Sequence, residues 1–183
     1  LLARRIEVRP VGRVELPALP APRPVLELSF HRGDTVKYTF EWDYRGFGRV
    51  PFPPSGDAVR DVAAEDALRD PLQAVWAEHL GTTLAPTGSF HDVAAAEFVT
   101  RTVPALETEG VTVTVSGRRK SYHELTGEPE ITVSTVESSD PDWFDLGVLV
   151  KIDGRTIPFE PLFTALSKGR KKLLLVDGSY FSL

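Results

Sequence analysis

Two Asp-Gly pairs, at residues 153–154 and 177–178, constrain the fold of this 183-residue chain more than any other feature. Asp and Gly tolerate the positive φ angles of two-residue hairpin turns, so each pair predicts a reversal between antiparallel strands. Apolar side chains alternate over residues 146–152, before the first pair, which is the period of a half-buried strand. Residues 173–176 and 179–183 are expected to pair across the second turn.

A short helix is predicted between the two hairpins. Pro158 suits its first turn, because the N–H that proline lacks would have no partner there. Gly169 is expected to end the helix. Apolar residues at helical spacing give this segment one apolar face, formed by Phe159, Leu162, Phe163 and Leu166.

The first half of the chain is predicted to contain a hairpin of two strands, residues 25–30 and 35–42. Their alternating apolar residues indicate a sheet with one face in a core. Repeated prolines make residues 16–24 a linker or an edge segment. A short strand is expected at residues 49–52.

From residue 57 onward the apolar pattern becomes helical. Asp57 is a candidate helix cap, and the Asp-Pro pair at residues 70–71 predicts that two helices meet there. A further helix is expected over residues 92–108, and Pro104 should kink it or split it.

The segments around this last helix are predicted to be loops and one strand. Residues 82–90 are rich in Thr, Pro and Gly, and residues 117–128 are charged, so both are expected to be loops. Valines alternate over residues 111–115 as a short strand. These patterns together predict an α+β fold, in which β-hairpins and short antiparallel sheets pack with three to four helices. We expect a β-rich part over 1–56 and a helical, then mixed part over 57–183, and one sheet could include strands of both.

Ordered sequence blocks occur through the second half of the chain. They are Phe98–Thr100, Val103–Leu106, Glu130–Val136, Asp142–Gly147, Ile157–Phe159 and Leu173–Leu183. Together they resemble the accessory region just upstream of the ATPase motor in bacterial Swi/Snf-type helicases of superfamily two. The resemblance covers roughly residues 90–183 and is loose over 1–90.

The resemblance implies a non-catalytic accessory domain that positions or regulates an adjoining ATP-driven DNA translocase in the bacterial cytoplasm. The motor of the same chain is then the expected partner, and duplex DNA is a candidate partner. No phosphate-binding loop of the GxxxxGK[ST] type occurs, so ATP and Mg are expected only in the motor and no cofactor is expected here. A protein-interaction module unrelated to DNA is the alternative, and a hydrolase is a third interpretation.

Composition sets further limits. There are no cysteines, which excludes disulfides, thiolate zinc sites and a cysteine nucleophile. No apolar run approaches the ~18 residues that a membrane helix needs, so no membrane partner is expected. The chain begins without Met and ends inside a predicted strand, which we interpret as a piece of a longer protein.

The net charge of −5 is unevenly distributed. Residues 1–56 have nine Lys/Arg against six Asp/Glu, residues 57–110 have three against ten, and residues 111–183 have nine against ten. A net negative charge does not attract phosphate over long distances, so strong non-specific DNA binding is not expected. Local basic patches are compatible with it.

Two basic runs are the candidate nucleic-acid contacts. Their residues are Arg118, Arg119 and Lys120 in the first run, and Arg170, Lys171 and Lys172 in the second. Phosphate contact is one interpretation, with Tyr122 or Tyr180 nearby for stacking on bases. The second run follows a predicted helix, so its cations could instead offset the negative end of the helix dipole.

Trp143 and Phe144 are a candidate protein interface, because aromatic anchors among charges suit an interface. Asp140, Asp142 and Asp145 surround them. Three carboxylates so close together could bind a divalent cation, but no Gly or closing Glu follows at calcium-loop spacing. We favour the structural interpretation, in which the aromatics fill the core and no metal is bound.

The hydrolase interpretation rests on His123 beside Glu124, with Ser121 nearby, or on the aspartate cluster. Adjacent residues on a loop point apart, so solvated loop polarity is the simpler interpretation. The four histidines are widely scattered and lack the spacing that places two ligands on one helical face. No catalytic or metal-binding residue is therefore predicted.

Overall fold

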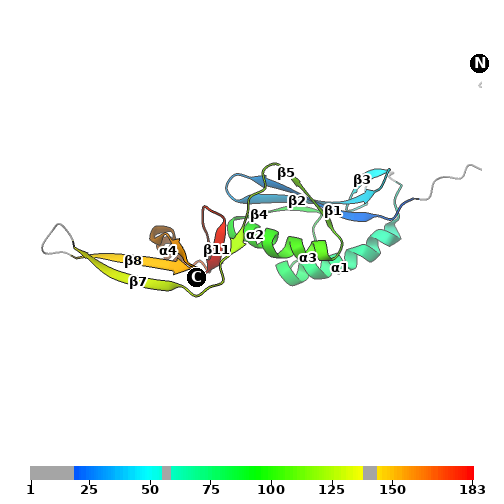
Figure 1. The fold of residues 1–183 in the computed structure, drawn as a ribbon. Helices are drawn as coiled ribbons and strands as arrows, with labels where there is room; N and C mark the ends of the chain where they lie inside the picture. Colours follow the sequence, from blue (N-terminus) through cyan, green and yellow to red (C-terminus); the bar gives the residue numbers. More distant parts are fainter. Residues whose placement is uncertain (1–18, 55–58, 138–143) are drawn as a thin grey trace, which may run out of the picture.

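The structure is a computed structural model that describes residues 19–54, 59–137 and 144–183. The molecule is elongated, with a five-stranded sheet at one end, a three-stranded sheet at the other and a second three-stranded sheet between them (Figure 1). The predicted α+β class is confirmed. The predicted cap Asp57 lies outside the described residues, as do residues 16–18 of the proline-rich segment 16–24.

The five-stranded sheet is built on the predicted first hairpin, now seen as β1 (Arg23–His31) and β2 (Thr35–Tyr44). β3 (Gly48–Pro51), β4 (Thr87–His91) and β5 (Thr112–Ser116) complete it in the order β3-β2-β1-β5, with β4 also on β2. The even-numbered residues of β2 are buried and the odd-numbered ones are not, as the alternation predicted. β5 pairs with β1 in parallel, so this sheet is mixed, which corrects the prediction of antiparallel pairing here.

β4 corrects the prediction of a loop at residues 82–90. Its Gly88 lies against the ring of Tyr38, and a Cβ at Gly88 would be 2.6 Å from the Tyr38 hydroxyl oxygen. The glycine therefore leaves room for a buried aromatic ring of the neighbouring strand. Because β4 consists mainly of glycine and polar residues, it lacks the apolar alternation that predicts a strand.

A single helix, α1 (Val62–Leu80), replaces the two helices predicted to meet near residue 70. Asp61 caps it by accepting a hydrogen bond from the N–H of Ala64 at 3.0 Å. Pro71 has no N–H to donate to the carbonyl of Ala67. Both residues lie on the exposed face of the helix. Water can satisfy that carbonyl, so the helix continues through the proline.

The next helical segment consists of α2 (Asp92–Glu97), the π turn η1 (Phe98–Thr102) and α3 (Val103–Thr108). The helix is divided near Pro104, as predicted. The division occurs through the π turn, which separates α2 from α3. The N–H of Val103 bonds to the carbonyl of Phe98, and this wider turn places Pro104 in the first turn of α3, where its missing N–H needs no partner.

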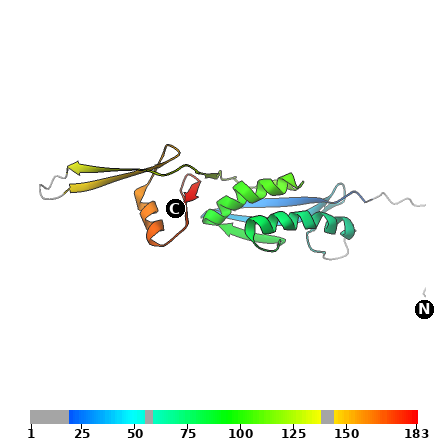
Figure 2. The ribbon, with the colours of Figure 1, turned by 90° about the horizontal axis from the view of Figure 1, so that it is seen from below.

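These helices cover one face of the five-stranded sheet (Figure 2). Between the two layers lies the first core, which contains large aromatic residues of both. Tyr38 of β2 is in contact with the rings of Trp76 and Phe98, with ring centroids 5.1 and 5.5 Å apart. Strands and helices from both sides of residue 56 share this sheet and this core.

The last third of the chain follows the predicted order of hairpin, helix and hairpin. Its elements are β7 (Glu130–Glu137), β8 (Phe144–Ile152), β9 (Arg155–Ile157), α4 (Phe159–Ser167), β10 (Lys172–Leu174) and β11 (Ser179–Ser182). Asp153 and Gly154 form the predicted two-residue turn, with φ angles of 52° and 72°. At the second pair only Gly178 has a positive φ, and the Leu175 N–H donates to the carbonyl of Ser179, so residues 176–178 form a three-residue turn instead. A second core lies between the β7-β8-β9 sheet and α4.

The predicted charged loop at residues 117–128 contains a short strand, β6 (His123–Glu124), which pairs in parallel with β11. Two residues are too few for an alternation pattern, so the strand could not be predicted locally. It completes the small sheet β10-β11-β6 between the two cores. In the part of the chain that the structure describes, no helix has the length and apolarity needed to cross a membrane.

Candidate nucleic-acid interface

A groove of about 840 Å³ lies where the five-stranded sheet meets the small middle sheet. Three segments that are far apart in the sequence form it: the β1–β2 turn, the loop after β5 and the β10–β11 turn. The lining residues are Phe30, His31, Arg32, Arg118, Arg119, Lys120, Ser121 and Asp177. The groove thus includes the whole first basic run, together with a histidine and an arginine that the sequence analysis did not single out.

Parallel pairing of β1 with β5 explains this meeting. The register places Ser29 opposite Ser116, so both strands end at the same edge of the sheet. Arg32 follows one strand end and Arg118 follows the other, and both chains leave the sheet at the same level. Only the pairing of two distant segments brings these arginines together.

Lys120 fixes the loop after β5 to the β1–β2 turn. Its ammonium forms an ion pair with Asp34, a turn residue with a positive φ of 49°, and lies 5.6 Å from the ring centroid of Tyr122. The hydroxyl of Tyr122 donates to the same carboxylate at 3.1 Å. Burial, followed by the negative charge of Asp34, raises the pKa of Tyr122, so this hydroxyl stays a donor at neutral pH.

Arg32, Arg118 and Arg119 are the cations of the groove that stay exposed. Within the described ranges, none of the three forms an ion pair with a carboxylate. A guanidinium presents several donors in a planar fork that matches a phosphate. The groove therefore offers three exposed forks, Arg118 and Arg119 on the loop after β5 and Arg32 in the β1–β2 turn, and the Lys120–Asp34 pair holds these two segments together.

The lone acidic residue of the lining, Asp177, is already bonded. Its carboxylate accepts from the backbone N–H and hydroxyl of Ser179, both at 2.9 Å, and from Arg155 at 3.1 Å. The bond from the Ser179 N–H is the main cause that lowers the pKa of Asp177. Because Arg155 offsets its charge, Asp177 repels an anion in the groove less than an unpaired carboxylate would.

The predicted stacking partners are unsuitable. Tyr180 is fully buried and its hydroxyl lies 2.7 Å from that of Thr100, and the ring of Tyr122 is also buried. Neither ring face is open to a base, because both belong to the first core. These two tyrosines therefore offer no stacking surface, and the arginines are the groups of the groove that suit phosphate.

The second basic run lies elsewhere. Lys172 forms an ion pair with Glu97 of α2, whereas Arg170 and Lys171 are exposed beyond the end of α4. None of the three lines the groove. The two runs thus have different surroundings.

Trp143, Asp140 and Asp142 lie outside the described residues. Phe144 and Asp145 are in β8, and their side chains lie outside the described part as well. The interface predicted at Trp143 and Phe144 stays a prediction.

His123 has a different partner from those expected. Its Nε2 lies 2.7 Å from the Oγ of Ser179 rather than near Ser121, and Glu124 accepts from Arg101. Ser179 is fully buried, and its hydroxyl donates to Asp177. This serine cannot reach a substrate, so the cluster fixes the β10–β11 turn and is not arranged for nucleophilic catalysis.

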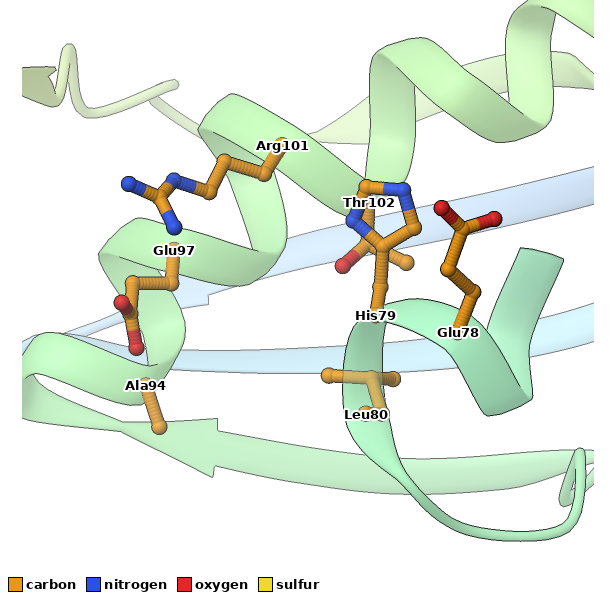
Figure 3. Close-up of a pocket in the computed structure, with 7 residues that line it drawn as sticks. All are labelled: Glu78, His79, Leu80, Ala94, Glu97, Arg101 and Thr102. Atoms are coloured by element: carbon orange, nitrogen blue, oxygen red, sulfur yellow. The ribbon is translucent and has the colours of Figure 1, made fainter.

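A smaller hollow of about 280 Å³ separates the end of α1 from α2 and η1 (Figure 3). Glu78 and His79 lie on one side of it, with Glu97 and Arg101 on the other. Lys172 pairs with Glu97, and Glu124 pairs with Arg101. Charges of both signs that are largely paired within the chain do not select a charged ligand. Among the described residues, no group of three His, Asp or Glu side chains could hold a metal ion.

Comparisons with protein-family models, with curated proteins and with solved structures found no match to this chain.

Proposed function

We propose that this chain is a non-catalytic accessory domain of a bacterial Swi/Snf-type DNA translocase, and that its arginine groove guides the duplex. The observation that supports this most directly is the convergence of Arg32, Arg118 and Arg119 on one groove. Sequence blocks over residues 90–183 support the link to the translocase. ATP and Mg belong to the adjoining motor in this proposal, and the present residues supply only positioning.

The binding mode follows from charge. With a net charge of −5, the chain does not draw duplex DNA from a distance. Three arginines at one place can still hold a backbone that the motor delivers. Because each phosphate contact releases about 0.9 counterion, three contacts predict a slope of about −3 for the logarithm of affinity against the logarithm of salt concentration. The affinity of the isolated chain is thus low and depends steeply on salt.

A titration of a fluorescein-labelled duplex with the 183-residue chain tests the proposal. Fluorescence anisotropy is measured at several salt concentrations below physiological ionic strength. The double variant Arg118→Gln/Arg119→Gln should reduce the slope to about −1, since two phosphate contacts are lost.

The matched control is Arg23→Gln/Arg45→Gln. These exposed arginines lie at the opposite end of the same sheet, beside Asp43 and Tyr44, and removing them changes the net charge equally. The control should keep the wild-type slope. Absence of binding at low salt, or equal losses in the two double variants, would overturn the proposed duplex contact.

A further inference from the structure

The outer face of α4 is apolar and uncovered. Leu162 and Ala165 point into the second core, but Phe163 is 59% exposed and Phe159 and Leu166 are also exposed. The rings of Phe159 and Phe163 stack with their centroids 5.8 Å apart. Three of the four residues predicted to form the apolar face of this helix therefore lie outside the core.

The neighbouring sheet has a second uncovered apolar surface. Residues opposite each other on antiparallel strands share a face, so Ile131 lies on the same face as Val150, and Val133 on the same face as Val148. Val150 is buried against the second core, whereas Ile131 and Val133 of β7 are 65% and 59% exposed. The second core therefore covers only one end of this face of the hairpin.

A hollow of about 160 Å³ joins the two surfaces. Leu166 of α4 and Ile131 of β7 both line it, and the other lining residues are Pro129, Val150, Ile152, Leu162, Phe181, Ser182 and Leu183. No charged side chain is among them. The exposed residues of α4 and of β7 thus form one continuous apolar corner between a helix and an open sheet face.

Cations stand at one end of this corner. The Leu183 N–H donates to the carbonyl of Lys171 at 2.9 Å, so Lys171 is beside the hollow that Leu183 lines. Lys168 and Arg170 are exposed in the same turn after α4. In the part of the chain described by the structure, none of these three forms an ion pair.

We propose that this apolar corner is a docking site for an amphipathic helix of a partner protein, with carboxylates that meet Lys168, Arg170 and Lys171. An added helix completes the layer that α4 begins over the open sheet face. Phe159, Phe163 and Leu166 follow the i, i+4, i+7 spacing that interlocks with the apolar stripe of another helix. The cations select acidic over basic partners, and the site is separate from the arginine groove.

The test uses two designed helical peptides labelled with fluorescein. Both peptides have leucines at i, i+3, i+4 and i+7. They differ only in the polar positions near one end, which are Glu in the acidic peptide and Lys in the basic one. Anisotropy titrations with the 183-residue chain should show binding of the acidic peptide at least tenfold tighter than that of the basic one. Phe163→Asp/Leu166→Asp should weaken binding of the acidic peptide at least tenfold.

Phe47→Asp is the control for the apolar contacts, because Phe47 is a similarly exposed phenylalanine (53%) in the distant β2–β3 turn.

Charge reversal by Lys168→Glu/Arg170→Glu/Lys171→Glu should invert the preference between the peptides. Circular dichroism confirms that these surface variants fold. Equal binding of the two peptides, unchanged binding by Phe163→Asp/Leu166→Asp, or binding of duplex DNA instead of the acidic peptide at these cations would overturn the proposal. Arg118→Gln/Arg119→Gln should leave peptide binding unchanged, which separates this site from the groove.

Discussion

Tyr180 and Phe181 are consecutive residues of β11, and their side chains lie in different hydrophobic cores. Successive residues of a strand point to opposite faces, so one short strand supplies both cores. The Tyr180 hydroxyl oxygen also lies 2.7 Å from that of Thr100 in η1, which ties the strand to the helical layer. The two cores are therefore coupled through β11.

Removal of the Tyr180 ring should destabilise the protein and uncouple its two cores. We expect Tyr180→Ala to lower the free energy of unfolding by about 3 to 5 kcal/mol, the usual cost of truncating a buried aromatic side chain. Tyr180→Phe keeps the ring and loses one hydrogen bond, which predicts a loss of about 1 kcal/mol. Urea unfolding of each variant, followed by far-UV circular dichroism, measures both values. A single transition for Tyr180→Ala at the wild-type midpoint would contradict the coupling.

Replacement of Glu65 should destabilise the protein strongly, although Glu65 belongs to a helix with one side exposed to solvent. Glu65 is fully buried, and it accepts from the Tyr44 hydroxyl at 2.6 Å and from Nη2 of Arg60 at 2.5 Å. Glu65→Ala leaves the Arg60 charge and the Tyr44 hydroxyl without this partner, so we expect a loss of about 3 to 5 kcal/mol.

The neighbouring Asp66 provides the control for Glu65. It pairs with Arg69 on the surface of the same helix at 2.8 Å, and exposed pairs of this kind contribute only about 0.5 kcal/mol. Asp66→Ala should therefore change the free energy of unfolding very little. Thermal or urea unfolding of both variants gives the comparison, and similar losses in the two would show that the buried pair contributes no more than the exposed one.

The protein should lose stability at alkaline pH because Tyr44 ionises there. Burial, with the hydrogen bond to Glu65, raises the pKa of Tyr44 from 10.0 to about 12. A proton bound more tightly in the folded state gives stability that is complete below pH 10 and is lost as the pH rises to about 12. A difference of two pKa units corresponds to about 3 kcal/mol. Tyr44→Phe lacks the titrating group, so its free energy of unfolding, measured in urea over this pH range, should decline less than that of the wild type. Parallel pH profiles would contradict this assignment.

Local chemistry determined much of the outline of the fold. The Asp-Gly pairs specified the positions of two hairpins, because a glycine with a positive φ reverses the chain at each turn. Gly81, which ends α1 with a positive φ of 66°, and the alternation of β2 are local in the same sense, since each depends on neighbouring residues only. Such features were predictable from the sequence without knowledge of distant contacts.

Features that depend on distant partners were not predictable in this way. β4 forms because Gly88 makes room for Tyr38, a residue fifty positions earlier, and α1 continues through Pro71 because that side of the helix faces water. The sequence offered both basic runs as phosphate contacts, yet the first lines the groove, whereas Arg170 and Lys171 of the second lie beside the apolar corner.

The sequence by itself determined the hairpins, the C-terminal ends of helices at glycine and the α+β class, because turn geometry and side-chain periodicity act over a few residues. Only the tertiary structure decided where the exposed cations gather and where the uncovered apolar residues meet. The parallel pairing of β1 with β5 brings Arg32 to Arg118, and the packing of α4 leaves Phe163 exposed. Both depend on contacts between segments far apart in the chain, where local patterns contain no information about the partner.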